Sequence, residues 1–311
     1  MKRPLRHTWQ ALLGLVLLVF LLRSVPLPEL SEALRSADVN WMLLAAVIFA
    51  LQGVLEAWRL LLVFRDYHLV WGQALRLFFV GLFFANFLPG SLGADLYQIQ
   101  QMHARESGLI KPAVFSFGLR VSGLLANVLA IALAVLLGAS VWQSLLQGLP
   151  LAEMPLLPFL LAMAVLATII CALLMIGKLP RWALNFLRSC RQQLQAFLRF
   201  PPGVLSLLLI LGLAVVLVRA LALALLLFAW GQQIPFGDML MVTALVALSM
   251  LLPLTVGGLG VREWVLVAGI VAAGGGEAEA LMVALVSRGF IWGLSLIGGV
   301  WFALLGRTQQ R

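Results

Sequence analysis

Two stretches of this chain share one unusual pattern. Residues 86–95 read NFLPGSLGAD and residues 251–263 read LLPLTVGGLGVRE. In both, an apolar run is interrupted by Leu-Pro, then by Ser or Thr and by Gly, and a carboxylate follows. Arg120 and Arg288 come 31 and 35 residues after the two prolines. The matching order predicts an internal duplication in which each half contains one broken membrane helix.

The composition places nearly all of the chain in a membrane. Apolar residues make up 63% of the 311 residues, charged residues only 11%, and the mean hydropathy is +1.08. The sequence therefore predicts an all-α polytopic membrane protein. The net charge of +9 does not indicate a nucleic-acid partner, because the basic residues cluster in short segments beside the apolar runs, where membrane orientation explains them.

The apolar runs predict a single transmembrane domain, residues 1–311, with about six full spans and two short hairpins. The first repeat covers 38–138 with its hairpin at 72–101, and the second covers 203–306 with its hairpin at 239–273. The arms of each hairpin are too short to cross a bilayer core of about 30 Å. The expected full spans are about 8–23, 38–64, 112–138, 156–177, 203–230 and 281–304.

Basic residues predict which ends of the spans face the cytoplasm. The N-terminus, the C-terminus and the segment 178–200, with five basic residues and no acidic one, should all be cytoplasmic. We interpret 178–200 as an amphipathic helix on anionic lipid. The charges agree only if hairpin 72–101 enters from the cytoplasmic face and hairpin 239–273 from the outer face. The two repeats are therefore expected to be inverted.

The broken stretches have the chemistry of an anion site. Proline and glycine interrupt the helices there, and the arms that begin near Ser91 and Leu259 present helix N-termini, whose N–H groups suit a phosphate. Ser91 and Thr255 are expected to cap these arms or to contact the ligand. The alternative is that the breaks are packing kinks.

Buried charges point to the same region. Four arginines face two carboxylates around the breaks, and an anionic ligand would offset the excess. Arg120 and Arg288, at duplicated positions, are the expected pair that flanks a phosphate. In the alternative, Asp95 and Glu263 neutralise arginines in buried ion pairs. Arg219 has no counterpart in the first half, and we interpret it as structural.

The predicted ligand-binding residues come from both stretches and from the helices after them. They are Asn86, Pro89, Gly90, Ser91, Gly93, Asp95, Arg120, Thr255, Gly257, Gly258, Gly260, Arg262, Glu263 and Arg288. No catalytic constellation, P-loop or metal-ligand spacing is present, so we expect no enzymatic activity, no cofactor and no metal site.

The two stretches, followed by arginine-bearing helices, resemble the flippase-like transmembrane domain of lysylphosphatidylglycerol synthetases over essentially the whole chain. The run GLGVRE is kept at 258–263, whereas Ala85 and Ala94 replace an Asn and a Gly of the family pattern. The resemblance implies a multi-pass protein of the bacterial cytoplasmic (inner) membrane. Because no aminoacyl-transfer domain follows in this sequence, a stand-alone member that does not aminoacylate lipid is expected.

The leading hypothesis is movement of an anionic phospholipid, or of a lipid-linked phosphate or sugar, between leaflets, with membrane lipids as partners. One alternative is a non-transporting scaffold that assists a lipid glycosyltransferase or another envelope-biosynthesis enzyme. Another is a secondary transporter of a small soluble anion. The sequence does not distinguish among specific lipids or oligomeric states.

Overall fold

The computed structural model describes residues 36–86, 92–105, 108–141, 192, 195, 197–251, 255 and 257–308. This part of the chain is α-helical, contains no strand, and confirms the predicted all-α polytopic class. The expected spans at 8–23 and 156–177, and most of segment 178–200, lie outside the described residues. The helices are α3 (Val39–Val63), α4 (Trp71–Ala85), α5 (Leu92–His103), α6 (Ile110–Leu136), α10 (Pro202–Phe228), α11 (Phe236–Ser249), α12 (Val261–Ala272) and α13 (Glu277–Thr308), with the 3-10 helix η1 (Arg65–Tyr67) after α3.

Helix length divides the helices into two groups. α3, α6, α10 and residues 277–304 of α13 have 25 to 28 residues and are apolar enough to cross a membrane. At 1.5 Å per residue each is about 38 Å or longer, which exceeds the bilayer core of about 30 Å. α4, α5, α11 and α12 have only 12 to 15 residues, or about 18–23 Å. They are the arms of the two predicted hairpins.

Two helices of the second half begin earlier than the sequence predicts. α13 starts at Glu277 rather than at 281, because carboxylates in its first turn favour the positive end of the helix dipole. α11 starts at Phe236 rather than at 239, and its first turn contains Asp238. The buried Asp238 carboxylate accepts hydrogen bonds from the backbone N–H groups of Ser140 and Val141, which ties α11 to the end of α6.

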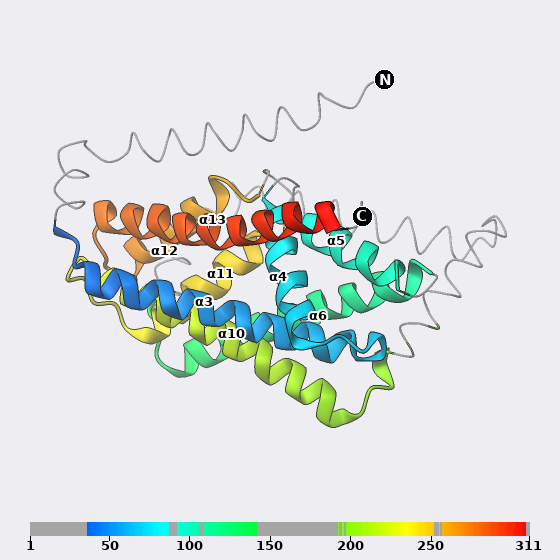
Figure 1. Ribbon diagram of the computed structural model, residues 1–311. Coiled ribbons are helices and arrows are strands. Elements are labelled where there is room, and N and C mark those ends of the chain that lie inside the picture. The colour runs from blue at the N-terminus through cyan, green and yellow to red at the C-terminus, as the bar shows by residue number, and fades with distance from the viewer. Residues whose placement is uncertain are drawn as a thin grey trace, which may run out of the picture.

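The long helices alternate in direction. Figure 1 shows α3 and α13 running one way along the molecule and α6 and α10 running the other way. The N–H of Asp38 donates to the carbonyl of Ala229 at 2.7 Å, which joins the start of α3 to the end of α10. Lys111, at the start of α6, forms an ion pair with Asp66, just after α3, at 3.4 Å. Both contacts make α3 antiparallel to its neighbours.

The two hairpins open at opposite ends of the long helices. Arg105, just after α5, donates to the carbonyl of Tyr67, so the α4–α5 hairpin opens where α3 stops. The bond from Val141 to Asp238 places the start of α11 where α6 stops, at the other end. The ends of the two hairpins that lead into the breaks therefore approach each other, at Asn86 and Gly257.

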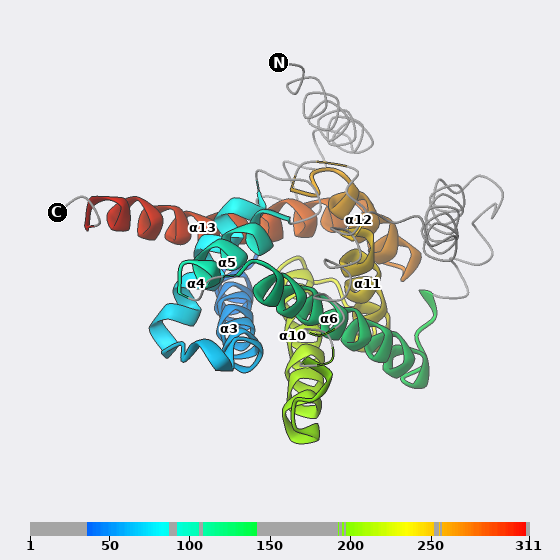
Figure 2. The ribbon, with the colours of Figure 1, turned by 90° about the vertical axis from the view of Figure 1, so that its right-hand side faces the viewer.

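The helix contacts follow one pattern in both halves. α4 packs on α5 and on α13, and correspondingly α11 packs on α12 and on α6, while α3 packs on α10 (Figure 2). Exchanging α3–α6 for α10–α13 leaves this set of contacts unchanged. Most helix contacts of one half therefore have a counterpart in the other; the exception is α6, which packs closely on α10, whereas α13 barely contacts α3.

The outer surface of the bundle is apolar. Leu43 on α3, Leu136 on α6 and Val300 on α13 are 61%, 83% and 61% exposed. In water such surface would be unfavourable, whereas in a bilayer it lies against acyl chains. The long apolar helices and this surface are those of a membrane protein.

Candidate functional site

The two helix breaks meet inside the bundle. Gly257, Gly258 and Gly260 have φ of 59°, 69° and 81°, in the left-handed region that glycine adopts without steric cost. The chain therefore turns at these glycines in the second break. A Cβ placed on Gly257 would lie 2.9 Å from the backbone oxygen of Asn86 in the first break. The tips are therefore in direct contact.

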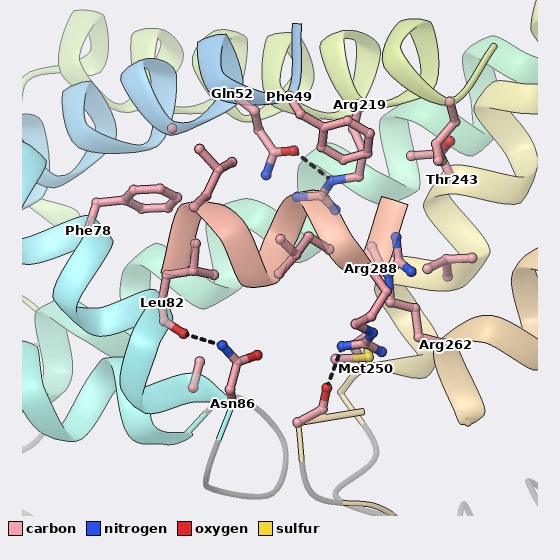
Figure 3. Close-up of a pocket in the computed structure, with 18 residues that line it drawn as sticks. Phe49, Gln52, Phe78, Leu82, Asn86, Arg219, Thr243, Met250, Arg262 and Arg288 are labelled. Carbon is pink, nitrogen blue, oxygen red and sulfur yellow. Dashed lines mark hydrogen bonds between the residues drawn. The ribbon is translucent and has the colours of Figure 1, made fainter. Parts of the chain in front are cut away.

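A cavity of about 260 Å³ lies beside this contact, near the middle of the long helices. Side chains from both halves line it, and Figure 3 shows arginines from α10, α12 and α13 around one space. Its polar lining consists of Gln52, Asn86, Arg219, Thr243, Arg262 and Arg288. Within the described residues, no cluster of His, Cys, Asp or Glu is placed to hold a metal ion.

Glu263 is the centre of a buried charge cluster. Its Oε1 accepts hydrogen bonds from Arg288 Nε at 2.7 Å and from Arg262 Nη1 at 3.2 Å, and its side chain is 1% exposed. Its Oε2 accepts a bond from the N–H of Gly260 at 2.8 Å, so Glu263 caps α12. Thr255, expected to cap this arm or to contact the ligand, forms no cap, because its buried hydroxyl has no hydrogen-bond partner among the described residues; the ligand contact stays a prediction.

Arg288 holds the second break in shape. Its Nη1 and Nη2 donate to the carbonyls of Gly257 and Gly258 at 3.0 and 3.2 Å. Arg262 Nη2 donates to Ser287 Oγ at 2.9 Å, which attaches α12 to α13. Both guanidiniums therefore combine a structural contact with a place in the cavity wall.

The first half contains a matching ion pair. Asp95 on α5 pairs with Arg120 on α6 and also accepts a hydrogen bond from Ser116 Oγ at 3.0 Å. In both halves the carboxylate precedes its arginine by 25 residues. Asp95 and Glu263 therefore neutralise arginines, as the alternative interpretation proposed. Arg120 does not line the central cavity.

Arg219, which we interpreted from the sequence as structural, also lines the central cavity. It lies on α10, and its Nε donates to Gln52 Oε1 on α3 at 3.3 Å (Figure 3). No carboxylate of the described residues forms an ion pair with it. The available signal was an arginine in the interior of an apolar span, which by itself indicates function.

The remaining predicted residues fall into two groups. Asn86 lines the cavity, and its Nδ2 donates to the carbonyl of Leu82 at 3.3 Å. Gly93 is buried where a Cβ would overlap the backbone oxygen of Phe84, so it allows α4 and α5 to approach closely. Pro89, Gly90 and Ser91 lie outside the described residues.

A second cavity of about 330 Å³ lies on the other side of the tips. Its wall is mostly apolar and includes Trp292 and Leu296 of α13, which are 48% and 62% exposed. It therefore extends towards the outer, apolar surface. Asn86, Gly257 and Arg288 line both cavities, so the meeting tips separate them.

Comparison with known proteins identifies the family. No curated protein and no solved structure is significantly similar to the chain. Residues 8–299 match the family model of the lysylphosphatidylglycerol synthase transmembrane region, which covers both breaks, both ion pairs and every helix that lines the cavities. The chain therefore belongs to the family of lysylphosphatidylglycerol synthase transmembrane regions.

Proposed function

We propose that this protein moves an anionic phospholipid, or a lipid-linked phosphate or sugar, between the leaflets of the bacterial inner membrane. The observation that carries the proposal is the cavity where the two broken tips meet, whose wall contains three arginines. In a low-dielectric interior unpaired cations are costly, and a phosphate that binds them offsets this cost. A head group held there is sheltered from the acyl chains.

The arrangement of the halves supports alternating access. The hairpins open at opposite ends of the long helices, and most helix contacts of one half have a counterpart in the other. We propose that these are inverted repeats, with the α4–α5 hairpin entering from the cytoplasm and the α11–α12 hairpin from outside. Broken helices that approach one midplane site from both faces are the architecture of many secondary transporters.

The second cavity provides a route for the acyl chains. Its apolar wall and its exposed Trp292 and Leu296 lie next to the tips. A lipid whose head group occupies the central cavity can keep its chains in this side cavity and in the bilayer. The acyl chains are then not exposed to water during the passage.

The test is lipid movement in vesicles that contain the purified protein. Arg219→Ala removes a cavity charge without breaking an ion pair of the described residues. We expect it to slow movement of a fluorescent anionic phospholipid by about tenfold or more, since a hydrogen bond to a charged group contributes about 1.5–3 kcal/mol. Dithionite quenching of the outer leaflet measures the rate.

Arg65→Ala is the matched control, because Arg65 lies after α3 and its side chain is 47% exposed, away from the cavity. It should leave the rate unchanged. Wild-type protein that moves no lipid, or an Arg219→Ala variant as fast as wild type with a normal melting temperature, would contradict the proposal.

A further inference from the structure

The charges around the central cavity do not balance. Three arginines line it, Arg219, Arg262 and Arg288. Glu263 is the carboxylate that contacts two of them, and it is shared between both. Three positive charges and one negative charge leave two positive charges in this part of the molecule.

Two other carboxylates of the bundle, Glu56 and Asp95, are already paired. Glu56, one turn after Gln52 on α3, forms an ion pair with Arg59 at 2.9 Å. Asp95, on the α4–α5 hairpin, forms its ion pair with Arg120 on α6. Each of these pairs is neutral, so among the described residues neither offsets the excess at the cavity. Two uncompensated charges in a low-dielectric interior favour a ligand that brings two negative charges.

The hydrogen-bond donors fit the same ligand. Arg219 uses its Nε for Gln52, and its Nη1 and Nη2 make no hydrogen bond within the described part of the chain. Two free guanidinium nitrogens form a fork that binds two oxygens of one phosphate. The facing Arg262 and Arg288 supply charge from the opposite wall, while their own donors mostly hold Glu263, Ser287 and the glycine carbonyls.

The size of the cavity sets a further limit. Its volume of about 260 Å³ is the space of roughly nine water molecules at about 30 Å³ each. A phosphate group and its first ester oxygen fit there, and a diphosphate also fits. The acyl or prenyl chain has to lie elsewhere, next to the tips.

We propose that the transported head group is a phosphate with two negative charges, either a terminal phosphomonoester or a diphosphate on a lipid. This inference rests on the proposed function and names its substrate class. A phosphodiester carries one negative charge and two free oxygens, so it leaves one cavity charge uncompensated. A lipid whose head group carries an added cation fits worse still.

The experiment compares two lipids with the same acyl chains in native mass spectrometry of the detergent-solubilised protein. Dioleoyl phosphatidic acid is the phosphomonoester, and dioleoyl phosphatidylglycerol is the phosphodiester. At pH 8.5 we expect the monoester to bind about tenfold or more tightly than the diester. At pH 5.5, below the second ionisation of a phosphomonoester near pH 6, the preference should disappear.

Arg219→Gln removes one of the two excess charges and should bring the two lipids to near-equal affinity at pH 8.5. Arg65→Gln, the matched change at an exposed position, should keep the wild-type preference. If Arg219→Gln does not fold, the pH dependence of the wild-type protein still tests the inference.

The outcomes separate the inference from the proposed function. Equal or tighter binding of the diester at pH 8.5 overturns the inference and leaves lipid movement intact. Failure to bind or to move either lipid overturns both. Soluble glycerol 3-phosphate is a third probe: if it binds as tightly as the lipid, the doubly charged phosphate is correct but its lipid carrier is wrong.

Discussion

Each hairpin has one carboxylate that faces an arginine of the next long helix, but the two carboxylates have different tasks. Glu263 holds two arginines and the N–H of Gly260, and its side chain is almost fully buried. Asp95 holds one arginine, and its side chain is 19% exposed. Removing a buried charge leaves its partners uncompensated, and the loss of folding stability grows with the number of partners and with their burial.

Glu263→Gln should therefore destabilise the protein strongly, by about 3–5 kcal/mol, which is the cost of breaking a buried ion pair. Asp95→Asn makes the matching change in the first half and should cost less. Thermal unfolding of both variants in the same detergent compares them. Equal losses of melting temperature, or a larger loss for Asp95→Asn, would show that Glu263 is not the centre of the cluster.

Single residues were predictable only where the duplication marked them. The equivalence of Arg120 and Arg288 was visible in the sequence. The structure adds that each arginine pairs with the carboxylate 25 residues before it, Asp95 and Glu263 respectively. Arg219 has no counterpart, so the duplication could not point to it. Its place in the cavity depends on how α3 packs against α10, and neither helix contains that information alone.

At the scale of helices, apolar runs and their interruptions placed most boundaries within three residues. The short arms were recognised because proline and glycine divide runs that would otherwise span. Contacts between helices were not predictable from these runs. α4 approaches α13 closely at Gly298, where a Cβ would overlap the backbone oxygen of Phe79.

Gly298→Ala should therefore push α4 away from α13 and lower the melting temperature, because the obstacle is backbone and cannot rotate away. Gly289→Ala, on the same helix with open space around it, is the matched control. It should raise stability slightly, since alanine is about 1 kcal/mol more favourable than glycine in a helix. A Gly298→Ala variant as stable as Gly289→Ala would contradict this packing.

At the scale of the whole molecule, two halves with largely matching helix contacts enclose a site that neither half forms alone. The charges of the loops predicted that the hairpins enter from opposite faces, and the hairpins open at opposite ends of the long helices. Most of the loops on which that charge count depends lie outside the described residues. Which face is cytoplasmic therefore stays a prediction.

The central claim is that a head group passes where the two tips meet, and a reversible cross-link there tests it most directly. Asn86 in the first break and Leu259 in the second both line the side cavity next to the contact of the tips, and neither has the left-handed φ that makes Gly257 unsuitable for a side chain. The variant combines Asn86→Cys and Leu259→Cys in a background where Cys171 and Cys190 are replaced by serine. Each single-cysteine variant is a matched control.

The measurement is lipid movement in vesicles before and after oxidation, with the cross-linked fraction determined on the same sample. We expect movement to fall in proportion to the cross-linked fraction and to return after reduction with dithiothreitol, while the single-cysteine variants do not respond to oxidation. Full cross-linking with an unchanged rate of lipid movement would contradict passage of the head group between the two halves.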